Sequence, residues 1–258
     1  SESEGVPIDM MIGLKFPAYL ARHSNPVFWL IHQHRQAYDM WSAGSSDLLD
    51  SPDGMMARDM IRAEDRAAFA RSARPLYANS QNVAGRLEKY LGLASTPLYH
   101  PPPLADQMTQ GSFGDYLFAP GRLNPSKRVD LMLRALAKVP GPLRLVIAGV
   151  PENPAYLDEL HRLAAALGIA GRVDWLGGVD NDTMIRHYAQ ARAVVFTPQD
   201  EDLGYITLEA MLSGKPVITT TDAGGPLEFI SHQREGLITA PDADALSQAF
   251  TTLSEDIA

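Results

Sequence analysis

From Leu117 onward, short apolar runs alternate with segments of helical period. Such alternation is typical of βαβ units around a parallel sheet. The run Leu143–Ala148 is almost continuously apolar, as expected for a central strand covered on both faces. The predicted strands are Tyr116–Ala119, Leu143–Ala148, Val173–Leu176, Ala193–Thr197, Pro216–Thr219 and Gly236–Ile238. The predicted helices are Val129–Lys138, Ala155–Leu167, Thr183–Ala191, Tyr205–Leu212 and Ala243–Leu253. We therefore expect a doubly wound α/β domain.

A shorter version of the same pattern precedes residue 105. Its predicted strands are Ile8–Leu14, Val27–His32 and Leu76–Asn79, and its predicted helices are Met55–Ala73 and Val83–Leu91. The Pro101–Pro103 run and the polar stretch that follows to Gly114 predict an extended interdomain linker. The sequence thus predicts a partial Rossmann-like domain over residues 1–105 and a Rossmann-like domain over residues 106–258.

Composition excludes several classes of function. The net charge of -9 argues against nucleic-acid binding, which needs clustered Lys and Arg. The absence of Cys removes disulfides, thiolate nucleophiles and Cys-based zinc sites. No apolar stretch approaches the roughly 18 residues of a membrane-spanning helix, which favours a soluble, cytoplasmic protein. The opening Ser-Glu-Ser-Glu, without initiator Met or signal pattern, is expected of a fragment.

Two carboxylates, Glu201 and Glu209, stand with seven residues between them around a predicted helix start at Gly204. Leu208, Met211 and Leu212 are expected to form the buried face of that helix, while Glu209 projects from its second turn. The first N–H groups of a helix favour a phosphate. This arrangement suits a nucleotide sugar. Backbone amides would bind the diphosphate, and one carboxylate on each side would accept hydrogen bonds from the hydroxyls of the ribose and of the sugar. The alternative is that both are ordinary surface carboxylates.

Two further turns follow predicted strands, where doubly wound folds place ligand contacts. In Gly121–Arg128, Arg122 can clamp phosphate oxygens and Lys127 adds a point charge. In Thr221–Glu228, the adjacent Gly224 and Gly225 let backbone approach a ligand closely. Taken alone, the first of these turns could be a solvated basic turn and the second a plain tight turn. Neither alternative explains why all three features fall at strand ends of one sheet.

Residues 117 to 253 resemble the C-terminal domain of the retaining glycosyltransferases of group 1, or family 4 in sequence classification, which have the GT-B fold. The resemblance rests on the following motifs, taken in order: Gly121-Arg122-Leu123…Lys127 with Asp130, Ile147-Ala148-Gly149, Val173…Leu176-Gly177, Glu201…Glu209, Gly214-Lys215-Pro216-Val217-Ile218 and Gly224-Gly225…Glu228. Two positions differ from the family, which usually has Phe in place of Leu203 and Gly in place of Arg128.

The resemblance implies a role for each matching position. Arg122 and Lys127 would bind the donor diphosphate, Glu201 the hydroxyls of the transferred sugar, and Glu209 the ribose. Gly178 and Val179 would meet the base. The remaining positions expected to line the donor site are Leu203, Gly204, Tyr205, Ile206, Thr207, Gly224 and Gly225.

The N-terminal part resembles the second half of the family's acceptor domain. His32, at the carboxyl end of a predicted strand, matches a His that the family often has near the reacting sugar, with His34 as the alternative. Local hydrogen bonding is the other explanation for either histidine, and His23 and His100 are assigned to structure. The family's first strands and its last helix have no counterpart, so we expect an incomplete acceptor half.

The resemblance implies transfer of a hexosyl unit from a nucleoside diphosphate sugar to an acceptor hydroxyl with retained configuration, in bacterial glycan or glycolipid synthesis. A UDP-sugar is the favoured donor and a GDP-sugar the second choice, with no cofactor or metal implied. The acceptor is a glycan, a lipid-linked sugar or a small molecule, and peripheral membrane contact is compatible with it. The alternatives are a nucleotide-sugar-binding fragment without catalysis and a nucleotide-sugar epimerase or phosphorylase of similar fold.

Overall fold

A computed structural model describes residues 2–255 of the chain. These residues divide into two compact units between His100 and Pro101. The sequence had predicted the division at residue 105. Each unit has a parallel sheet of its own, and the two units are described separately below.

The C-terminal unit has a parallel sheet of six strands in the order β12-β11-β10-β7-β8-β9. The strands are β7 (Tyr116–Pro120), β8 (Arg144–Ala148), β9 (Val173–Gly177), β10 (Ala193–Val195), β11 (Val217–Thr220) and β12 (Gly236–Thr239). The helices are α4 (Val129–Lys138), α5 (Pro154–Ala166), α6 (Asn181–Gln190), α7 (Tyr205–Leu212) and α8 (Ala243–Glu255). Every predicted strand and helix of this unit is therefore confirmed, with shifts of one or two residues at most ends.

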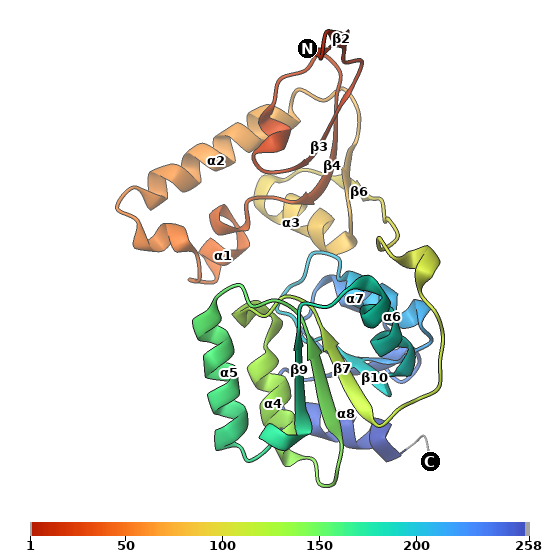
Figure 1. Ribbon diagram of the computed structural model, residues 1–258. Helices are drawn as coiled ribbons and strands as arrows, with labels where there is room; N and C mark the ends of the chain where they lie inside the picture. Colours follow the sequence, from red (N-terminus) through yellow and green to blue (C-terminus); the bar gives the residue numbers. More distant parts are fainter. Residues whose placement is uncertain (1, 256–258) are drawn as a thin grey trace. The chain divides into compact units, whose positions relative to one another are not determined.

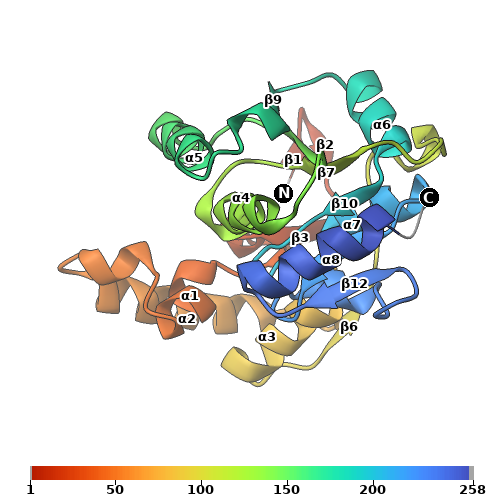
Figure 2. The same ribbon diagram turned by 90° about the horizontal axis from the view of Figure 1, so that it is seen from below.

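Helices cover both faces of this sheet, with α4, α5 and α8 on one side and α6 and α7 on the other (Figures 1 and 2). In the pairing of β7 with β8, Leu117 lies opposite Leu145, and both pack with the first group of helices. The next pair, Phe118 and Val146, packs with the second group. Successive side chains of a strand point to opposite faces, so a strand buried on both sides must be continuously apolar.

The buried face of α7 differs from the prediction. Thr207 and Ala210 are fully buried, whereas Leu212 is 41% exposed. Met211 is partly buried against the core on the α6 and α7 side, and Leu208 has an intermediate exposure. The helical period correctly predicted a helix, but the small residues Thr207 and Ala210 face the sheet because that side of α7 lies against β10 and β11.

The stretch predicted as a linker is also different. Residues Pro101–Pro103 lie outside regular structure as expected, and a 3-10 turn, η4 (Ala105–Gln107), follows them. The remainder packs on the C-terminal unit, because the Gly114 amide donates to the Gln190 carbonyl at 3.0 Å. A Cβ at Gly111 would lie only 2.6 Å from the Ala189 carbonyl oxygen. Residues 111–114 therefore belong to the fold of this unit, as the predicted domain bounds of 106–258 imply, and do not form the extended linker that the sequence also predicted there.

The N-terminal unit has a four-stranded parallel sheet in the order β3-β4-β5-β6. Its strands are β3 (Met11–Lys15), β4 (Pro26–His32), β5 (Leu76–Ala78) and β6 (Ser95–Pro97), and a short hairpin pairs β1 (Glu2–Ser3) with β2 (Val6–Pro7). Its α-helices are α1 (Asp39–Ser42), α2 (Gly54–Phe69) and α3 (Gln81–Leu91), and its 3-10 turns are η1 (Ala18–Leu20), η2 (Arg35–Ala37) and η3 (Asp47–Asp50). Each predicted strand and helix has a counterpart here, but β3 begins three residues later and α2 ends four residues earlier than predicted. The short elements α1 and β6 were not predicted, because neither has a clear apolar period.

A buried carboxyl group anchors α2 within this unit. Asp65 is fully buried, and its two oxygens accept hydrogen bonds from the hydroxyls of Tyr19 at 2.8 Å and Tyr38 at 2.7 Å. Burial raises the pKa of Asp65, although both hydrogen bonds act in the opposite direction. The tyrosines themselves are also buried, so the cluster joins α2 to the segments that follow β3 and β4.

Candidate functional site

Three loops at the carboxyl ends of neighbouring strands are hydrogen-bonded to one another. We call them the β7 loop (residues 121–128), the β10 loop (residues 196–204) and the β11 loop (residues 221–225). The Gln199 amide donates to the Ser126 carbonyl at 2.9 Å, which joins the first two loops. The Glu201 amide donates to the Ala223 carbonyl, and the Gly225 amide donates to the Glu201 carbonyl, both at 2.8 Å. The three motifs identified in the sequence therefore meet at one edge of the sheet.

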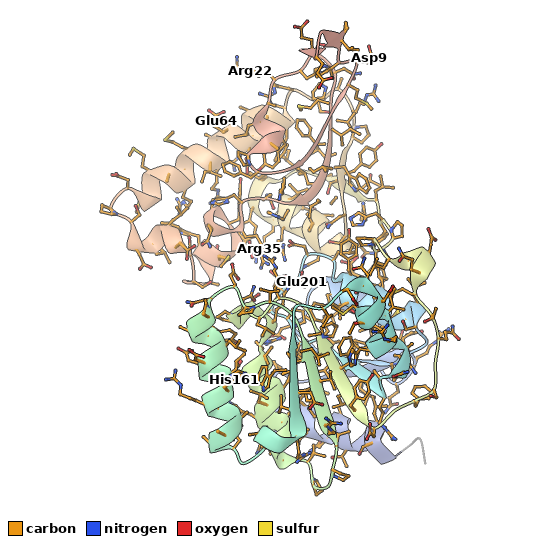
Figure 3. The ribbon with its side chains drawn as sticks, viewed as in Figure 1. Asp9, Arg22, Arg35, Glu64, His161 and Glu201 are labelled. Carbon is orange, nitrogen blue, oxygen red and sulfur yellow. The ribbon has the colours of Figure 1, made fainter. Side chains whose placement is uncertain are left out.

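The centre of this arrangement is an ion pair between Lys127 and Glu201. Lys127 closes the 3-10 turn η5 (Pro125–Lys127), and Glu201 lies in the β10 loop above the carboxyl ends of the strands (Figure 3). The Lys127 ammonium donates to Oε2 of Glu201, with only 18% and 25% of the two side chains exposed. The ammonium also lies 5.5 Å from the centre of the Phe196 ring. Partial burial strengthens such a pair relative to one on the open surface.

Helix α7 begins beside this pair. Gly204 has a φ of 85°, and a Cβ there would lie 2.8 Å from Cγ of Pro226. Leu203, Gly204 and Thr207 are buried, Ile206 is partly buried, and Tyr205 is 37% exposed. The Oγ1 atom of Thr207 is buried without a hydrogen-bond partner among the described residues. The Thr207 amide donates to the Gly204 carbonyl at 3.0 Å. The N–H groups before it lack acceptors within the helix and carry partial positive charge, so this start is suited to an anion.

The turns on either side of the helix start require glycine. A Cβ at Gly225 would lie 2.6 Å from the Asp202 carbonyl oxygen, and Gly224 has a φ of 76°. At the end of β8, a Cβ at Gly149 would lie 1.8 Å from the Gly121 carbonyl oxygen. Gly121 in turn approaches Ile206 of α7. These contacts leave no room for side chains where the loops converge.

Glu209 lies on the second turn of α7, as predicted. Its Oε2 atom accepts a hydrogen bond from the hydroxyl of Tyr188, on α6, at 2.6 Å. Burial raises the pKa of Glu209, and the hydrogen bond from Tyr188 partly offsets that effect. Tyr188 therefore fixes one oxygen of this carboxylate and leaves Oε1 for another donor. Tyr188 was not recognised in the sequence, because a Tyr of a predicted helix resembles an ordinary core residue.

The two donor-side positions expected to meet the base both follow β9, whereas Arg122 lies in the β7 loop. Gly178 follows β9, and a Cβ there would lie 3.0 Å from Cγ2 of Val150. Val179 packs against the core that contains Tyr188. Arg122 is exposed in the β7 loop, and no hydrogen bond or ion pair engages its guanidinium among residues 2–255. Arg122 is thus available to a ligand, whereas Lys127 is already paired.

Arg128 was noted in the sequence only as a departure from the family pattern. The structure gives its guanidinium five hydrogen bonds within the β10 loop and the end of β11. Its backbone has the left-handed conformation, with a φ of 54°. The sequence signal that pointed to it was the replacement of a glycine at this position.

The candidate histidines belong to the N-terminal unit. His32 is the last residue of β4, and its Nδ1 lies 2.6 Å from the Gln33 carbonyl oxygen. Because a carbonyl only accepts, Nδ1 is the donor in this hydrogen bond, and no hydrogen bond engages Nε2 among the described residues. The ring of His34 packs at a tilt against Phe16, with 4.8 Å between the ring centres, and the pKa of His34 is lowered by burial and by the nearby His32. The preference for His32 over His34 stays a prediction.

The histidines assigned to structure have local partners. Nε2 of His23 lies 2.8 Å from the Ile8 carbonyl oxygen, and His100 packs edge-on against Trp29. Among the side chains that the structure describes, those of His, Asp and Glu form no group of three that suits a metal ion. None of the described helices is both long and apolar enough to cross a bilayer.

Comparison with known proteins gives a consistent result. A sequence profile of the family described as Glycosyl transferases group 1 matches residues 114–257. The D-inositol 3-phosphate glycosyltransferase of Mycolicibacterium smegmatis is 34% identical over 136 residues, which cover 50% of this chain and 31% of that protein. An uncharacterized glycosyltransferase of Methanocaldococcus jannaschii is 35% identical over 123 residues, covering 47% of this chain and 30% of that protein. The aligned part thus spans about 30% of the length of these curated relatives.

Solved structures show the same fold. The HepE protein of Anabaena in complex with UDP-glucose aligns with a TM-score of 0.66 and 26% identity, over 76% of this chain and 58% of that one. Sucrose-phosphate synthase from Thermosynechococcus elongatus aligns with a TM-score of 0.78 and 17% identity, over 96% of this chain and 65% of that one. These neighbours and the two parallel sheets confirm the predicted GT-B fold class.

Proposed function

The chain belongs to the group 1 glycosyl transferases, and on this premise we propose that its C-terminal unit binds a nucleoside diphosphate sugar. We further propose that a hexosyl unit passes from this donor to an acceptor hydroxyl with retained anomeric configuration. The observation that carries the proposal is the Lys127–Glu201 ion pair at the junction of three strand-end loops. A UDP-sugar is the favoured donor, because the Anabaena relative was solved with UDP-glucose, and a GDP-sugar is the alternative.

The diphosphate is assigned to the basic groups and the start of α7. Lys127 exchanges Glu201 for a phosphate oxygen when the donor binds, and the exposed Arg122 adds a second cation. The positive end of α7 lies beside them. Negative charge develops on the diphosphate as the glycosidic bond breaks, so cations and amides already in place lower the barrier. Glu201, released from Lys127, accepts hydrogen bonds from hydroxyls of the transferred sugar.

The nucleoside is assigned to the neighbouring strand ends. Oε1 of Glu209 accepts from the ribose hydroxyls, while Tyr188 holds the other carboxylate oxygen. Gly178 and Val179, after β9, contact the base through their backbone. Leu203 to Thr207, Gly224 and Gly225 place backbone groups along the diphosphate and sugar.

The acceptor side is assigned to the N-terminal unit. His32 contributes its Nε2 atom near the reacting sugar, because Nδ1 is already committed to the Gln33 carbonyl. The leaving phosphate takes the proton of the acceptor hydroxyl on the same face of the sugar. A glycan, a lipid-linked sugar or a small molecule serves as acceptor, in bacterial glycan or glycolipid synthesis. Neither a cofactor nor a metal enters this scheme. A cytoplasmic location stays a prediction.

Calorimetric titration with UDP, GDP and UDP-glucose tests the donor assignment. We expect Lys127→Ala to weaken nucleotide binding by about tenfold or more, as loss of a charge-assisted hydrogen bond predicts. Lys138→Ala is the matched control, because Lys138 ends the helix that follows Lys127 and its partner Asp244 is on the open surface. Equal affinities of Lys127→Ala and Lys138→Ala would contradict the phosphate assignment.

A binding fragment without catalysis is the second candidate, since the chain aligns with only about 30% of its curated relatives' length. Incubation with UDP-glucose and candidate acceptors, followed by measurement of released UDP, separates the two functions. Release that depends on acceptor supports the transferase. Conversion of the sugar within an intact UDP-sugar would instead indicate an epimerase.

A further inference from the structure

Arg128 has a backbone conformation that does not suit an arginine. Its φ of 54° and ψ of 45° lie in the left-handed region. In this region the Cβ atom lies too close to the carbonyl oxygen that follows it, so glycine, which has no Cβ, adopts the conformation most easily. The strain must be offset by contacts that the side chain makes.

The guanidinium binds two loops at once. Nε donates to the Thr197 carbonyl at 2.7 Å, and Nη2 donates to the Pro198 carbonyl at 2.6 Å, both in the β10 loop. Nη1 and Nη2 each donate to one oxygen of Asp222, at 2.8 Å, in the β11 loop. Nη2 also reaches Oγ1 of Thr220 at 2.8 Å. Arg128 itself ends the β7 loop, so this one side chain joins all three loops.

The same loops hold the groups proposed to bind the donor. The Asp200 amide donates to the Asp222 carbonyl at 2.9 Å, immediately beside the Arg128–Asp222 pair. The next residue, Glu201, pairs with Lys127, the neighbour of Arg128. Lys127 and Arg128 therefore hold the β10 loop at two points, through the Glu201 side chain and through the Thr197 and Pro198 carbonyls.

Direct contact between Arg128 and a phosphate does not fit this geometry. Only 17% of the Arg128 side chain is exposed, and five acceptor atoms already surround its N–H groups. A guanidinium has five N–H donors in a fixed plane, so it would have to abandon these partners to bind an anion. Arg122, by contrast, is exposed and unengaged among the described residues.

We propose that Arg128 is a positioning residue for the nucleotide-sugar site, holding the β10 and β11 loops in the arrangement that presents Lys127, Glu201 and Gly224 to the donor. The inference rests on the proposed function of that site. Arg128 acts before the ligand arrives, since a site that is already ordered loses less entropy on binding.

The test combines affinity with amide exchange in four proteins: the wild type, Arg128→Gly, Asp222→Asn and the double variant. Glycine removes the guanidinium and also relieves the backbone strain, so the fold tolerates this change better than other substitutions. Arg144→Gln is the control, because Arg144 forms an ion pair with Asp174 on the surface of the same unit. All titrations with UDP are run well below the melting temperature of each variant.

We expect Arg128→Gly and Asp222→Asn each to weaken UDP binding by about tenfold, and the double variant to bind no more weakly than Arg128→Gly. Hydrogen exchange of the Asp200, Glu201 and Gly225 amides should accelerate in all three variants. Arg144→Gln should match the wild type in both measurements. Non-additive losses of this kind show that the two residues act as one unit.

Two results would overturn the inference while leaving the proposed function intact. In the first, Arg128→Gly binds UDP as tightly as the wild type does, even if its melting temperature is lower. That result would mean that Arg128 has only a structural role. The other is unchanged or tighter binding in Asp222→Asn with weaker binding in Arg128→Gly, which would indicate direct contact with phosphate. A wild-type chain that binds neither UDP nor GDP refutes the proposed function instead, and the inference falls with it.

Discussion

Lys215 gives the sharpest test of how the C-terminal unit is held together. It lies in the Gly-Lys-Pro-Val motif, and only 2% of the residue is exposed. Its ammonium donates to the carbonyls of Gly111 at 2.8 Å and Ser112 at 3.1 Å, and lies 4.2 Å from the centre of the Phe113 ring. We predict that these contacts hold residues 111–113 against the segment that leads into the N-terminal end of β11.

The expected size of the effect follows from these contacts. Hydrogen bonds from a charged donor contribute about 1.5–3 kcal/mol each, and the aromatic contact adds about 0.5–2 kcal/mol. Burial works against the ammonium and lowers the pKa of Lys215, so the net contribution is well below that sum. Lys215→Met keeps an unbranched side chain that is one heavy atom shorter and removes the charge. We expect this change to lower the free energy of unfolding by about 2 kcal/mol and the melting temperature by roughly 4–8 °C.

Urea unfolding and amide exchange measure both parts of this prediction. The slope of the urea transition should stay constant, while exchange accelerates at residues 111–115. Lys138→Met is the control, since the Lys138 side chain is 47% exposed and its loss should change stability by less than about 0.5 kcal/mol. If Lys215→Met and Lys138→Met prove equally stable, the reasoning about Lys215 is wrong.

Two further predictions concern the ends of the sheet and the N-terminal unit. Gly149→Ala should lower the free energy of unfolding by about 3 kcal/mol or more in urea, because its Cβ would lie 1.8 Å from the Gly121 carbonyl oxygen. Gly171→Ala is its control, since no atom lies within 4 Å of a Cβ there, and equal losses in both variants would contradict the steric argument. Asp65 has a raised pKa in the folded state, so its contribution to stability is full below the unfolded value of about 3.9 and is lost as pH rises through the folded value. Asp65→Asn should remove this pH dependence from unfolding measured between about pH 3 and pH 8, and an unchanged slope would show that Asp65 is not its source.

Much of the fold was determined by local sequence. The apolar run at Leu143–Ala148 could only be buried on both faces, and the period of Val129–Lys138 matches the observed helix in both bounds. Glycine and charged residues after these strands also indicated that the three motifs meet at one edge of the sheet, as the loop contacts show. Each of these inferences depends on neighbours within a few residues, where periodicity and turn chemistry act directly.

Other features depend on residues far apart in the chain. Lys127 and Glu201 are separated by 74 positions, and Arg128 and Asp222 by 94. Whether such groups meet is decided by the order of strands in the sheet and by the path of each loop. The packing of residues 111–114 and the burial of Thr207 in place of Leu212 have the same origin. Local patterns were enough to predict most strands and helices and the residues that follow them, but not the short elements β6 and α1. Which side chains touch depends on the folded sheet, because their contacts form between segments that are distant in the chain.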